Sequence, residues 1–511
     1  MSKSPGGYQT AARLTAITGP YELAPGPHLF TDWRFIDAGV PSYVDETGKT
    51  LPLKGEGRLR QVWHRGKGVP CGIRIVAEQP VKSTPIVGPI GASVIYDSGR
   101  YRSWSGANHS ESEDGFHWKS EAEGQDRNPL FFERTGVHGP GVFVDDSALP
   151  GERYKMVFMS ELGRPDREAL RTQICETYKR ERPHDIDPSF DVRGRIDGIF
   201  GAVSADGLYW KPIDGPFILH MADNPNTCCY DARLQKYVLY TRASWMYGRR
   251  GIGRSESDTF GPFPQPEMIV WSDLFRLPSD DIYTNAKCVY PGTLDYHFLF
   301  PAIYHRAEDN CSIEMMSSPD GIHWFNVPEN PIVTGAPETF DDGSLFTSCG
   351  LVPLGPDLVG LPYQGSTFPH KYPRWKDRDD RGQTRYAIWK KGRLACVEAP
   401  GEGFFATPVL KLPGRQLRIN CKTPMTGEIR VEIVEIKSWV CKKKTEEVIE
   451  GRSFEDCDPI SGDHLSHTVT WKGQSDLGHA ENQPIYFRFK LRAAKLFAFE
   501  CESTDQATHK K

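Results

Sequence analysis

The architecture of this chain depends on a motif first seen as Ser112-Glu113-Asp114-Gly115-Phe116-His117-Trp118. It recurs as Ser204-Ala205-Asp206-Gly207-Leu208-Tyr209-Trp210 and as Ser318-Pro319-Asp320-Gly321-Ile322-His323-Trp324, with a worn copy from Ser255 to Gly261. An Asp-Gly pair supplies the positive-φ residue of a tight turn, and the Trp three places after the glycine falls on the return strand. We therefore predict that each copy is the tip of an outer β-hairpin, repeated once per structural unit.

Pairs of strand-like segments precede the tips and recur along the chain. They lie at 93–97 and 101–104, 141–146 and 154–159, 228–231 and 237–242, 286–290 and 296–300, and 345–350 and 358–363. Each small sheet needs neighbours to bury both of its faces, so five such units predict a closed, five-bladed β-propeller. A linear β-solenoid is the alternative, although it requires shorter and more regular repeats.

The pattern of polar and apolar residues divides the chain into further segments. Residues 1–27 look irregular, the propeller is predicted over 28–400, and the segment 504–511 is predicted to be a disordered tail. Residues 401–503 contain no hairpin motif, and polar and apolar residues alternate along several of its segments. This alternation predicts a C-terminal β-sandwich, so the fold class is all-β.

A helical insertion is predicted within the second unit, at about 165–193. Leu170, Ile174 and Tyr178 follow one another at intervals of four residues, which is typical of one amphipathic helix. We expect this helix to lie on a face of the propeller as a lid or a packing element.

Composition excludes several classes of function. The 511 residues include 49 Gly, 40 Pro and 11% aromatic residues, which favours a turn-dense β protein. A formal net charge of −5 offers no basic surface for nucleic acid or membrane. The 12 cysteines form no Cys-x-x-Cys pair, which argues against a structural zinc site. With no signal peptide and no run long enough to span a bilayer, we expect a cytoplasmic protein.

Acidic residues precede the first strand of several units. In a propeller these strand starts converge on one funnel, so their side chains are candidates for a common site. The candidate acids are Asp32, Asp223, Asp281 and Asp341. Two or three carboxylates around one funnel can divide the cleavage of a glycosidic bond, one donating a proton and another activating water or attacking the sugar. The competing interpretation is that each acid caps a turn.

Six other residues are candidates for holding a substrate. His138, Tyr283 and Glu338 precede inner strands, Arg242 ends a strand, His370 lies on a loop, and Trp104 could line the funnel. The phosphate loop, the His-Glu-x-x-His pattern and the Gly-x-Ser-x-Gly elbow are all missing from the sequence, which disfavours nucleotide, zinc-protease and serine-hydrolase chemistry. We expect no cofactor. An axial calcium ion is compatible with oxygen ligands, but no spacing specifies it.

Beyond these residues, the chain resembles the five-bladed propeller glycosidases of glycoside hydrolase families 32 and 43, and more closely a group of bacterial family-32-like proteins. The resemblance lies in the hairpin motif, the Tyr-Lys-Met type of middle strand, the trailing β domain and the phrases Leu29-Phe30-Thr31-Asp32, Gly151–Met156, Asp281-Ile282-Tyr283 and Phe340–Gly343. It implies a funnel directed at carbohydrate.

The catalytic sequence motifs of family 32 have no match in this chain. The Trp-x-Asn-Asp-Pro-Asn phrase is absent, Arg378-Asp379-Asp380 lacks the proline of Arg-Asp-Pro, and Glu500-Cys501 stands in the presumed sandwich. The acids are therefore assigned from position alone.

Three hypotheses follow. In the first, a glycoside hydrolase acts on an oligosaccharide with a furanosidic or other linkage. Asp32 is its base or nucleophile, Asp341 the partner, and Asp223 or Asp281 the remaining acid. The second is a non-catalytic carbohydrate-binding propeller, and the third a uronic-acid lyase in which Arg242 pairs with the carboxylate of the sugar. The expected partner is an oligosaccharide or glycoside, and the sequence leaves the oligomeric state open.

Overall fold

The structure is a computed structural model. It describes residues 20–39, 69–106, 108–120, 137–161, 197–219, 222–245, 249–272, 276–332, 335, 337–371, 379, 381–440 and 443–502, the short strands Tyr43–Val44, Thr50–Leu51 and Trp63–His64, and the helical residues Thr172, Glu176 and Arg180. These three residues are exposed, and the rest of the predicted helical insertion lies outside the described residues. In the described part of the chain, no helix is long and apolar enough to cross a membrane.

The chain forms two compact units. Unit 1 contains residues 1–78, 327–329 and 390–511, and unit 2 contains residues 79–326 and 330–389. The sequence analysis began the propeller at residue 28, but residues 28–78 belong to unit 1. The reason is strand pairing, since strands from this segment add to the sheet built by the C-terminal residues. Strand β2 (His28–Leu29) pairs with β37 (Ile485–Glu502), and β6 (Arg74–Ala77) pairs with β31 (Ala395–Ala406).

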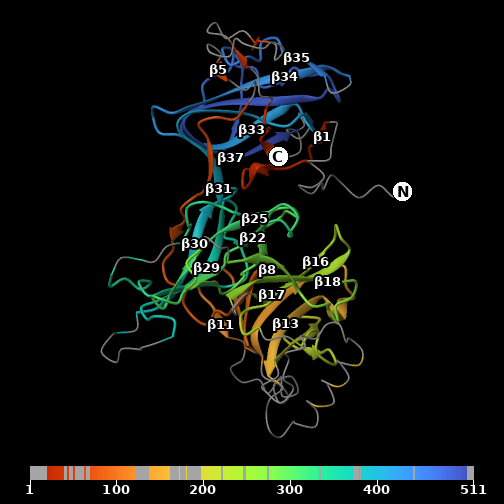
Figure 1. The fold of residues 1–511 in the computed structure, drawn as a ribbon, viewed down its shortest axis with the longest axis vertical. Helices are drawn as coiled ribbons and strands as arrows, with labels where there is room; N and C mark the ends of the chain where they lie inside the picture. Colours follow the sequence, from red (N-terminus) through yellow and green to blue (C-terminus); the bar gives the residue numbers. More distant parts are fainter. Residues whose placement is uncertain are drawn as a thin grey trace, which may run out of the picture. The chain divides into compact units, whose positions relative to one another are not determined.

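Unit 2 consists of small antiparallel sheets in a propeller-like arrangement (Figure 1). Among the described residues, four are separate four-stranded sheets. They are β8 (Ser93–Asp97), β9 (Arg100–Ser105), β10 (Asn108–Ser112) and β11 (Lys119–Ser120); β12 (His138–Val144), β13 (Tyr154–Glu161), β14 (Asp197–Ser204) and β15 (Lys211–Pro212); β16 (Thr227–Asp231), β17 (Lys236–Trp245), β18 (Arg249–Ser257) and β19 (Glu267–Trp271); and β21 (Cys288–Val289), β22 (His297–Leu299), β25 (Met316–Ser318) and β26 (Phe325–Asn326).

The other strands of unit 2 join one eight-stranded sheet, so four separate blades are found where five were predicted. This sheet contains β20 (Asp280–Ile282), β23 (Ala302–His305), β24 (Asn310–Ile313), β27 (Ser344–Thr347), β28 (Val352–Pro353), β29 (Leu358–Ser366), β30 (Gln383–Lys390) and β7 (Val81–Lys82). A parallel bridge between Cys311 and Ser344 connects its two halves. Pro301 separates β22 from β23, because proline has no backbone N–H to donate to a ladder.

Two contacts join the first and last parts of unit 2. Strand β7 pairs with β30, the last strand of the unit. The start of β8 forms a parallel bridge, Ser93 to Cys349, in which the Val94 N–H donates to the Cys349 carbonyl at 2.9 Å. Residues far apart in the sequence are therefore paired, as ring closure requires.

The repeated motif forms the predicted hairpin tips. Gly115, Gly207 and Gly321 have φ values of 82°, 80° and 74°. In the first copy the Ser112 hydroxyl accepts a hydrogen bond from the Gly115 N–H at 2.9 Å, and the Asp114 carboxylate accepts from the Phe116 N–H at 2.7 Å. The same bonds recur in the other two copies. The local turn chemistry read from the sequence is confirmed.

The tryptophans of two tips, Trp118 and Trp210, pack between neighbouring sheets. Trp118 joins a buried cluster that combines Val94 and Tyr101 of one sheet with Val352 and Tyr386 of another. Trp210 packs with Trp104 and Tyr154, which belong to two different sheets. These contacts bury apolar surface on both faces of each sheet, and this burial stabilises the arrangement.

Unit 1 is organised around the 18-residue strand β37. Strands β31, β33 (Gln416–Lys422) and β34 (Glu428–Val440) all pair with it, and they run together in Figure 1. With β1 (Tyr21–Glu22), β2, β6, β32 (Leu410–Lys411), β35 (Lys443–Val448) and β36 (Asp463–Thr468) they form one ten-stranded sheet among the described residues. The C-terminal all-β domain is thus present, but the predicted sandwich is not confirmed.

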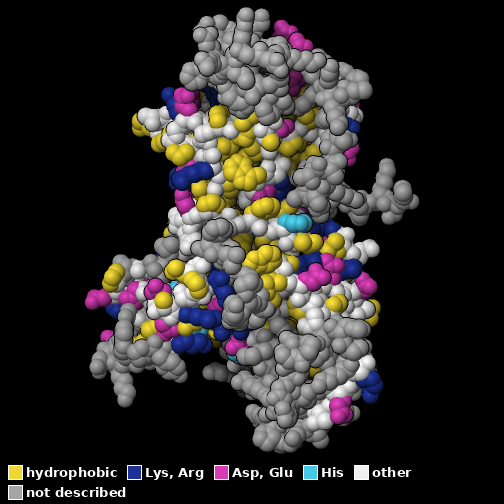
Figure 2. All heavy atoms as spheres, in the orientation of Figure 1, with side chains coloured by type: hydrophobic (Ala, Val, Ile, Leu, Met, Phe, Trp, Pro, Cys, Tyr) yellow, Lys and Arg dark blue, Asp and Glu magenta, His cyan; other side chains and the backbone are white. Residues whose placement is uncertain are grey.

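Two smaller features complete the fold. Strands β3 (Tyr43–Val44), β4 (Thr50–Leu51) and β5 (Trp63–His64) form a three-stranded sheet in unit 1. On the face of the molecule shown in Figure 2, acidic and basic side chains lie side by side. This mixture is consistent with the small net charge of the sequence.

Candidate functional site

A cavity of about 610 Å³ lies where the inner strands of unit 2 begin. Most of its wall comes from residues 90–92, 137–140, 223–225, 283–284 and 346–348, and residues 105–106, 364 and 384 complete it. Strands β8, β12, β16 and β21 begin at, or shortly after, the first four of these segments. We call this space the mouth cavity. Its position matches the funnel that the sequence analysis predicted at the strand starts.

Three of the predicted site residues line the mouth cavity: His138, Asp223 and Tyr283. A fourth, Arg242 on β17, contacts two of them. Its guanidinium donates a hydrogen bond to the Asp223 carboxylate and a second one, at 3.3 Å, to the Tyr283 carbonyl. With His370, which packs against the Tyr283 ring, the structure brings together five of the ten predicted residues.

Asp223 is the carboxylate of the mouth cavity, and its side chain is 38% exposed. Burial raises the pKa of this carboxyl, but the charge and hydrogen bond of Arg242, with the charges of Arg250 and His138, outweigh burial and lower the pKa below its ordinary value. Asp223 is therefore an ionised carboxylate at neutral pH. In a glycosidase, such a group stabilises positive charge or attacks the sugar.

The half-buried Tyr283 lies among cations. The guanidinium carbons of Arg242 and Arg250 each lie 5.0 Å from the centre of its ring, and the Lys371 ammonium lies 6.0 Å away. His370, which the sequence analysis proposed as a substrate-binding residue, packs edge-on against the same ring, with 4.9 Å between ring centres. The positive charges make this side of the site suited to an anionic or electron-rich group.

His138 has a defined tautomer. Its Nε2 lies 2.7 Å from the Asp223 carbonyl oxygen, which can only accept, so Nε2 carries the proton. In the uncharged form of the ring, the lone pair is therefore on Nδ1. The side chain is exposed, so Nδ1 can exchange a proton with a bound molecule.

Asn224 also lines the mouth cavity, and it is 3% exposed. Its side-chain oxygen has no hydrogen-bond partner among the described residues. An unpaired buried acceptor costs free energy of about 1–3 kcal/mol, so such groups usually mark a place where a ligand or water donates. Asn224 offers an acceptor to a ligand hydroxyl or N–H.

Two of the predicted catalytic acids of unit 2 are not among the residues that line the cavity. Asp281 is completely buried and forms ion pairs with Arg250, at 2.9 Å, and with Arg306. Asp341 is 1% exposed and accepts from the Lys82 ammonium at 2.5 Å. Both carboxylates are thus held in ion pairs with cations from other parts of unit 2. A catalytic role for these two acids stays a prediction.

Asp32, the predicted base or nucleophile, belongs to unit 1, whereas the mouth cavity is built from unit 2. Asp32 is 4% exposed. It caps the short 3-10 turn Trp33–Phe35 and accepts from the guanidinium of Arg34 at 2.6 Å. Its position in the sequence suggested an inner strand, but the segment pairs with β37 instead. Asp32 is a capping residue of unit 1.

Trp104 and Glu338 also differ from the prediction. Trp104 is completely buried between sheets and donates its indole N–H to the Gly207 carbonyl at 2.9 Å. Glu338 is exposed on a turn, where it has a φ of 71°, and its N–H donates to the Asp342 carboxylate at 2.6 Å. Neither residue lines the mouth cavity.

Metal chemistry receives no support from the described side chains. Within the described ranges, no group of three or more His, Cys, Asp or Glu side chains could hold a metal ion. Asp223 and His138 are close together, but the pair alone is too small a ligand set. The expectation that no cofactor is needed stays a prediction.

Comparisons with known proteins give similar folds only at low identity. No family model matches the chain, and no curated protein matches it. Among solved structures, a thermostable family-43 glycoside hydrolase is 13% identical with a TM-score of 0.38, and the match covers 61% of this chain and 92% of the other. For the GH32 β-fructofuranosidase of Bombyx mori the values are 10%, 0.36, 84% and 95%. For an N-acetylgalactosamine deacetylase from F. plautii they are 14%, 0.36, 70% and 96%.

These three solved structures are enzymes of different activities, and their sequence identities to this chain and their TM-scores are low. The sequence analysis missed a role for Asn224, Arg250 and Gln364, the last of which also lines the cavity. Asn224 follows Asp223 directly, so its place before an inner strand was the available signal. Arg250 and Gln364 lie within strands and carried no local signal.

Proposed function

We propose that the protein is a carbohydrate-active enzyme that binds a saccharide in the mouth cavity and cleaves a glycosidic bond there. The observation that carries this proposal is the polar set on the wall of one cavity: the ionised Asp223, the proton-exchanging His138, Tyr283 and the unpaired acceptor of Asn224. A volume of about 610 Å³ lies within the range of small-molecule sites. Hydroxyl groups of a sugar would satisfy both donors and acceptors here.

The proposed chemistry uses two groups with different protonation. Asp223 is the ionised partner, which stabilises the positive charge that develops at the anomeric carbon or attacks that carbon. His138 transfers the proton, because its Nδ1 is not used by the bond to the Asp223 carbonyl. Arg242 is a positioning residue, since it fixes the Asp223 carboxylate and lowers its pKa. These roles replace those first given to Asp32, Asp281 and Asp341.

We also infer that the ring of unit 2 counts five blades. The segments that precede or begin β8, β12, β16 and β21 all reach the mouth cavity, and so do residues 346–348 at the end of β27. Strands β27, β29, β30 and β7 pair in this order within the eight-stranded sheet, which is the pattern of a fifth blade whose outer strand comes from the other end of the unit. Strand β7 precedes the first blade in the sequence but pairs with the last strand of the unit, and this pairing supports a fifth blade that closes the ring.

A second candidate, a uronic-acid lyase, is favoured by the cations around Tyr283. A carboxylate on the sugar would meet Arg242, Arg250 and Lys371. In this reaction a base removes the proton next to the carboxylate and the glycosidic oxygen leaves, so a carbon–carbon double bond forms in the product. His138 or Tyr283 would be the base.

The test is a panel of neutral and uronic-acid oligosaccharides and aryl glycosides incubated with the wild-type protein. New reducing ends without ultraviolet absorbance identify hydrolysis, and reducing ends with ultraviolet absorbance identify the lyase. Binding without either signal identifies a carbohydrate-binding propeller. His138→Gln should keep sugar affinity and lose turnover at least 100-fold. His117→Gln is the matched control, because the His117 side chain is 72% exposed on a hairpin tip. If no sugar binds, the proposal is wrong.

A further inference from the structure

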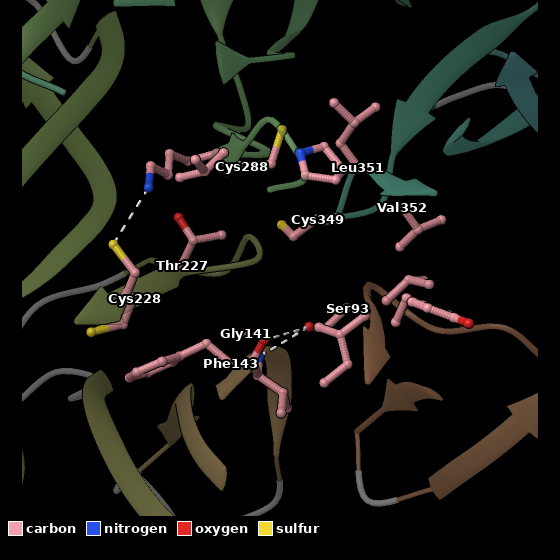
Figure 3. A pocket seen from close by; sticks show the side chains of 18 of the residues that line it. Ser93, Gly141, Phe143, Thr227, Cys228, Cys288, Cys349, Leu351 and Val352 are labelled. Atoms are coloured by element: carbon pink, nitrogen blue, oxygen red, sulfur yellow. Dashed lines mark hydrogen bonds between the residues drawn. The ribbon is translucent and has the colours of Figure 1, made fainter. Parts of the chain in front are cut away.

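A second cavity, of about 460 Å³, lies further along the inner strands of unit 2. Its wall comes from β8, β12, β16, β21 and the segment 349–353, and Figure 3 shows their side chains converging on it. We call it the axial cavity. Four cysteines line it, namely Cys228, Cys229, Cys288 and Cys349, together with one lysine, Lys287. The chemistry of the mouth cavity uses none of them.

Lys287 and Cys229 form a pair in the axial cavity. The Lys287 ammonium donates to the Cys229 sulfur at 3.4 Å. Lys287 is 6% exposed, and its ammonium lies 5.1 Å from the centre of the Tyr240 ring. Among the described residues, no carboxylate forms an ion pair with it.

The absence of a carboxylate near Lys287 has a consequence for Cys229. A buried ammonium needs a counter-charge, because burial without one costs several kcal/mol. Glu256, which lies on the same sheet as Cys229, is paired with Arg254 at 2.5 Å and with Lys236 at 3.4 Å. Burial lowers the pKa of Lys287, but its attraction to Cys229 and Tyr240 outweighs burial and raises the pKa. The sulfur of Cys229 is thus the acceptor that the geometry offers to Lys287.

The other cysteines of the axial cavity differ from Cys229. Burial raises the pKa of the Cys288 and Cys349 thiols to about 12, and it raises the pKa of Cys228 as well. Cys228 belongs to a different buried cluster from the one that Cys229 packs against. This is expected, since neighbouring residues of a strand point to opposite faces. Cys228 is therefore not placed to form a disulfide with Cys229.

We propose that Cys229 is a nucleophilic thiolate, held by Lys287, that takes peroxides and other small uncharged electrophiles entering the axial cavity. With hydrogen peroxide, the sulfur attacks one oxygen, an S–O bond forms and the O–O bond breaks. The leaving hydroxide takes a proton from the Lys287 ammonium and becomes water. Sulfur is oxidised to a sulfenic acid and the peroxide is reduced. Thiolate, ammonium and peroxide thus give sulfenic acid, amine and water.

The site stands apart from the proposed sugar chemistry, so its test needs no substrate. The folded wild-type protein is treated at pH 7 with iodoacetamide, and in parallel with hydrogen peroxide and dimedone. The labelling rate of each cysteine is read by peptide mass spectrometry. Cys71 is exposed and serves as the internal reference. The proposal expects Cys229 to react at least as fast as Cys71, despite its partial burial. A rate slower than that of Cys71 overturns it.

Two substitutions separate charge from shape. Lys287→Met removes the ammonium and should lower the Cys229 rate at least tenfold, whereas Lys287→Arg keeps a cation and should retain most of it. Lys236→Met is the control on the same sheet, because Lys236 is 39% exposed and pairs with Glu256. An unchanged Cys229 rate in a folded Lys287→Met protein contradicts the proposal. If this variant does not fold, the ratio of the Cys229 labelling rate to the Cys71 labelling rate in the wild-type protein still tests the proposal.

Discussion

The guanidinium of Arg242 donates a hydrogen bond to the carboxylate of Asp223 on the wall of the mouth cavity. Thr227, at the start of β16, pairs with Tyr240 of β17, so Arg242 lies just beyond the paired residues and beside the loop that carries Asp223. The pair is thus set by the register of one antiparallel ladder. This relationship defines the electrostatics of the site.

Replacing Arg242 should change the pH dependence of the proposed reaction. In Arg242→Met the Asp223 carboxyl loses its main cation, so its pKa rises and the acidic limb of the pH–rate profile moves to higher pH. Arg242→Lys keeps the charge and should shift the limb less. Rates measured from pH 3 to 7 test this. An acidic limb at the same pH in Arg242→Met would contradict the role of Arg242.

Asn224 should matter for ligand binding and not for folding. Asn224→Ala removes a buried acceptor that has no partner among the described residues, so the free energy of unfolding should stay the same or rise by about 1 kcal/mol. Affinity for the sugar should fall about tenfold, because one hydrogen bond to the ligand is lost. Calorimetry and denaturant unfolding of the same protein separate the two effects. A destabilised variant with full affinity would show a structural role.

The glycine of a hairpin tip should tolerate substitution less well than a glycine in an open turn. Gly321 has a φ of 74°, and a Cβ there would lie 2.4 Å from the Tyr240 hydroxyl, so Gly321→Ala combines backbone strain with a clash. Gly355 has a φ of 80° with open space around it. Gly355→Ala should lower the free energy of unfolding by about 1–2 kcal/mol, and Gly321→Ala by at least about 1 kcal/mol more. Equal costs in urea unfolding would argue against the clash.

His28 should make unit 1 less stable in acid. Burial lowers the pKa of His28 to about 4, from an ordinary value of 6.5. Between pH 6.5 and about pH 4, His28 therefore binds a proton in the unfolded chain but stays uncharged in the folded chain. The free energy of unfolding falls over this range by about 3 kcal/mol. Unfolding measured between pH 4 and 7 tests this. His28→Gln, which does not titrate, should flatten that part of the profile.

Local chemistry explains why much of the fold could be predicted. The Asp-Gly turns need a positive φ at Gly115, Gly207 and Gly321, and this requirement is written in the residues themselves. The paired strand segments between the tips follow from it. The assignment of residues 28–78 could not be read in the same way, because β2 and β6 join the sheet of unit 1 through partners more than 300 residues away.

The candidate site was predicted only in part for a related reason. The rule that strand starts converge identified His138, Asp223 and Tyr283 correctly as neighbours. It could not tell an acid that faces the cavity from one that turns inward to pair with a cation. Asp281 and Asp341 stand at similar places in the sequence, yet Arg250 and Lys82 reach them from other strands and Arg306 from the turn after β23. These pairings are tertiary and leave no local pattern.

The most direct test of the central claim is the turnover of Asp223→Asn on the best saccharide from the panel. Asparagine keeps the shape of the side chain and removes its charge. The account predicts a loss of kcat of at least 100-fold with sugar affinity kept within about threefold. The control is Glu113→Gln, whose side chain is 86% exposed on a hairpin tip and which should retain full turnover. Full turnover in Asp223→Asn would contradict the account.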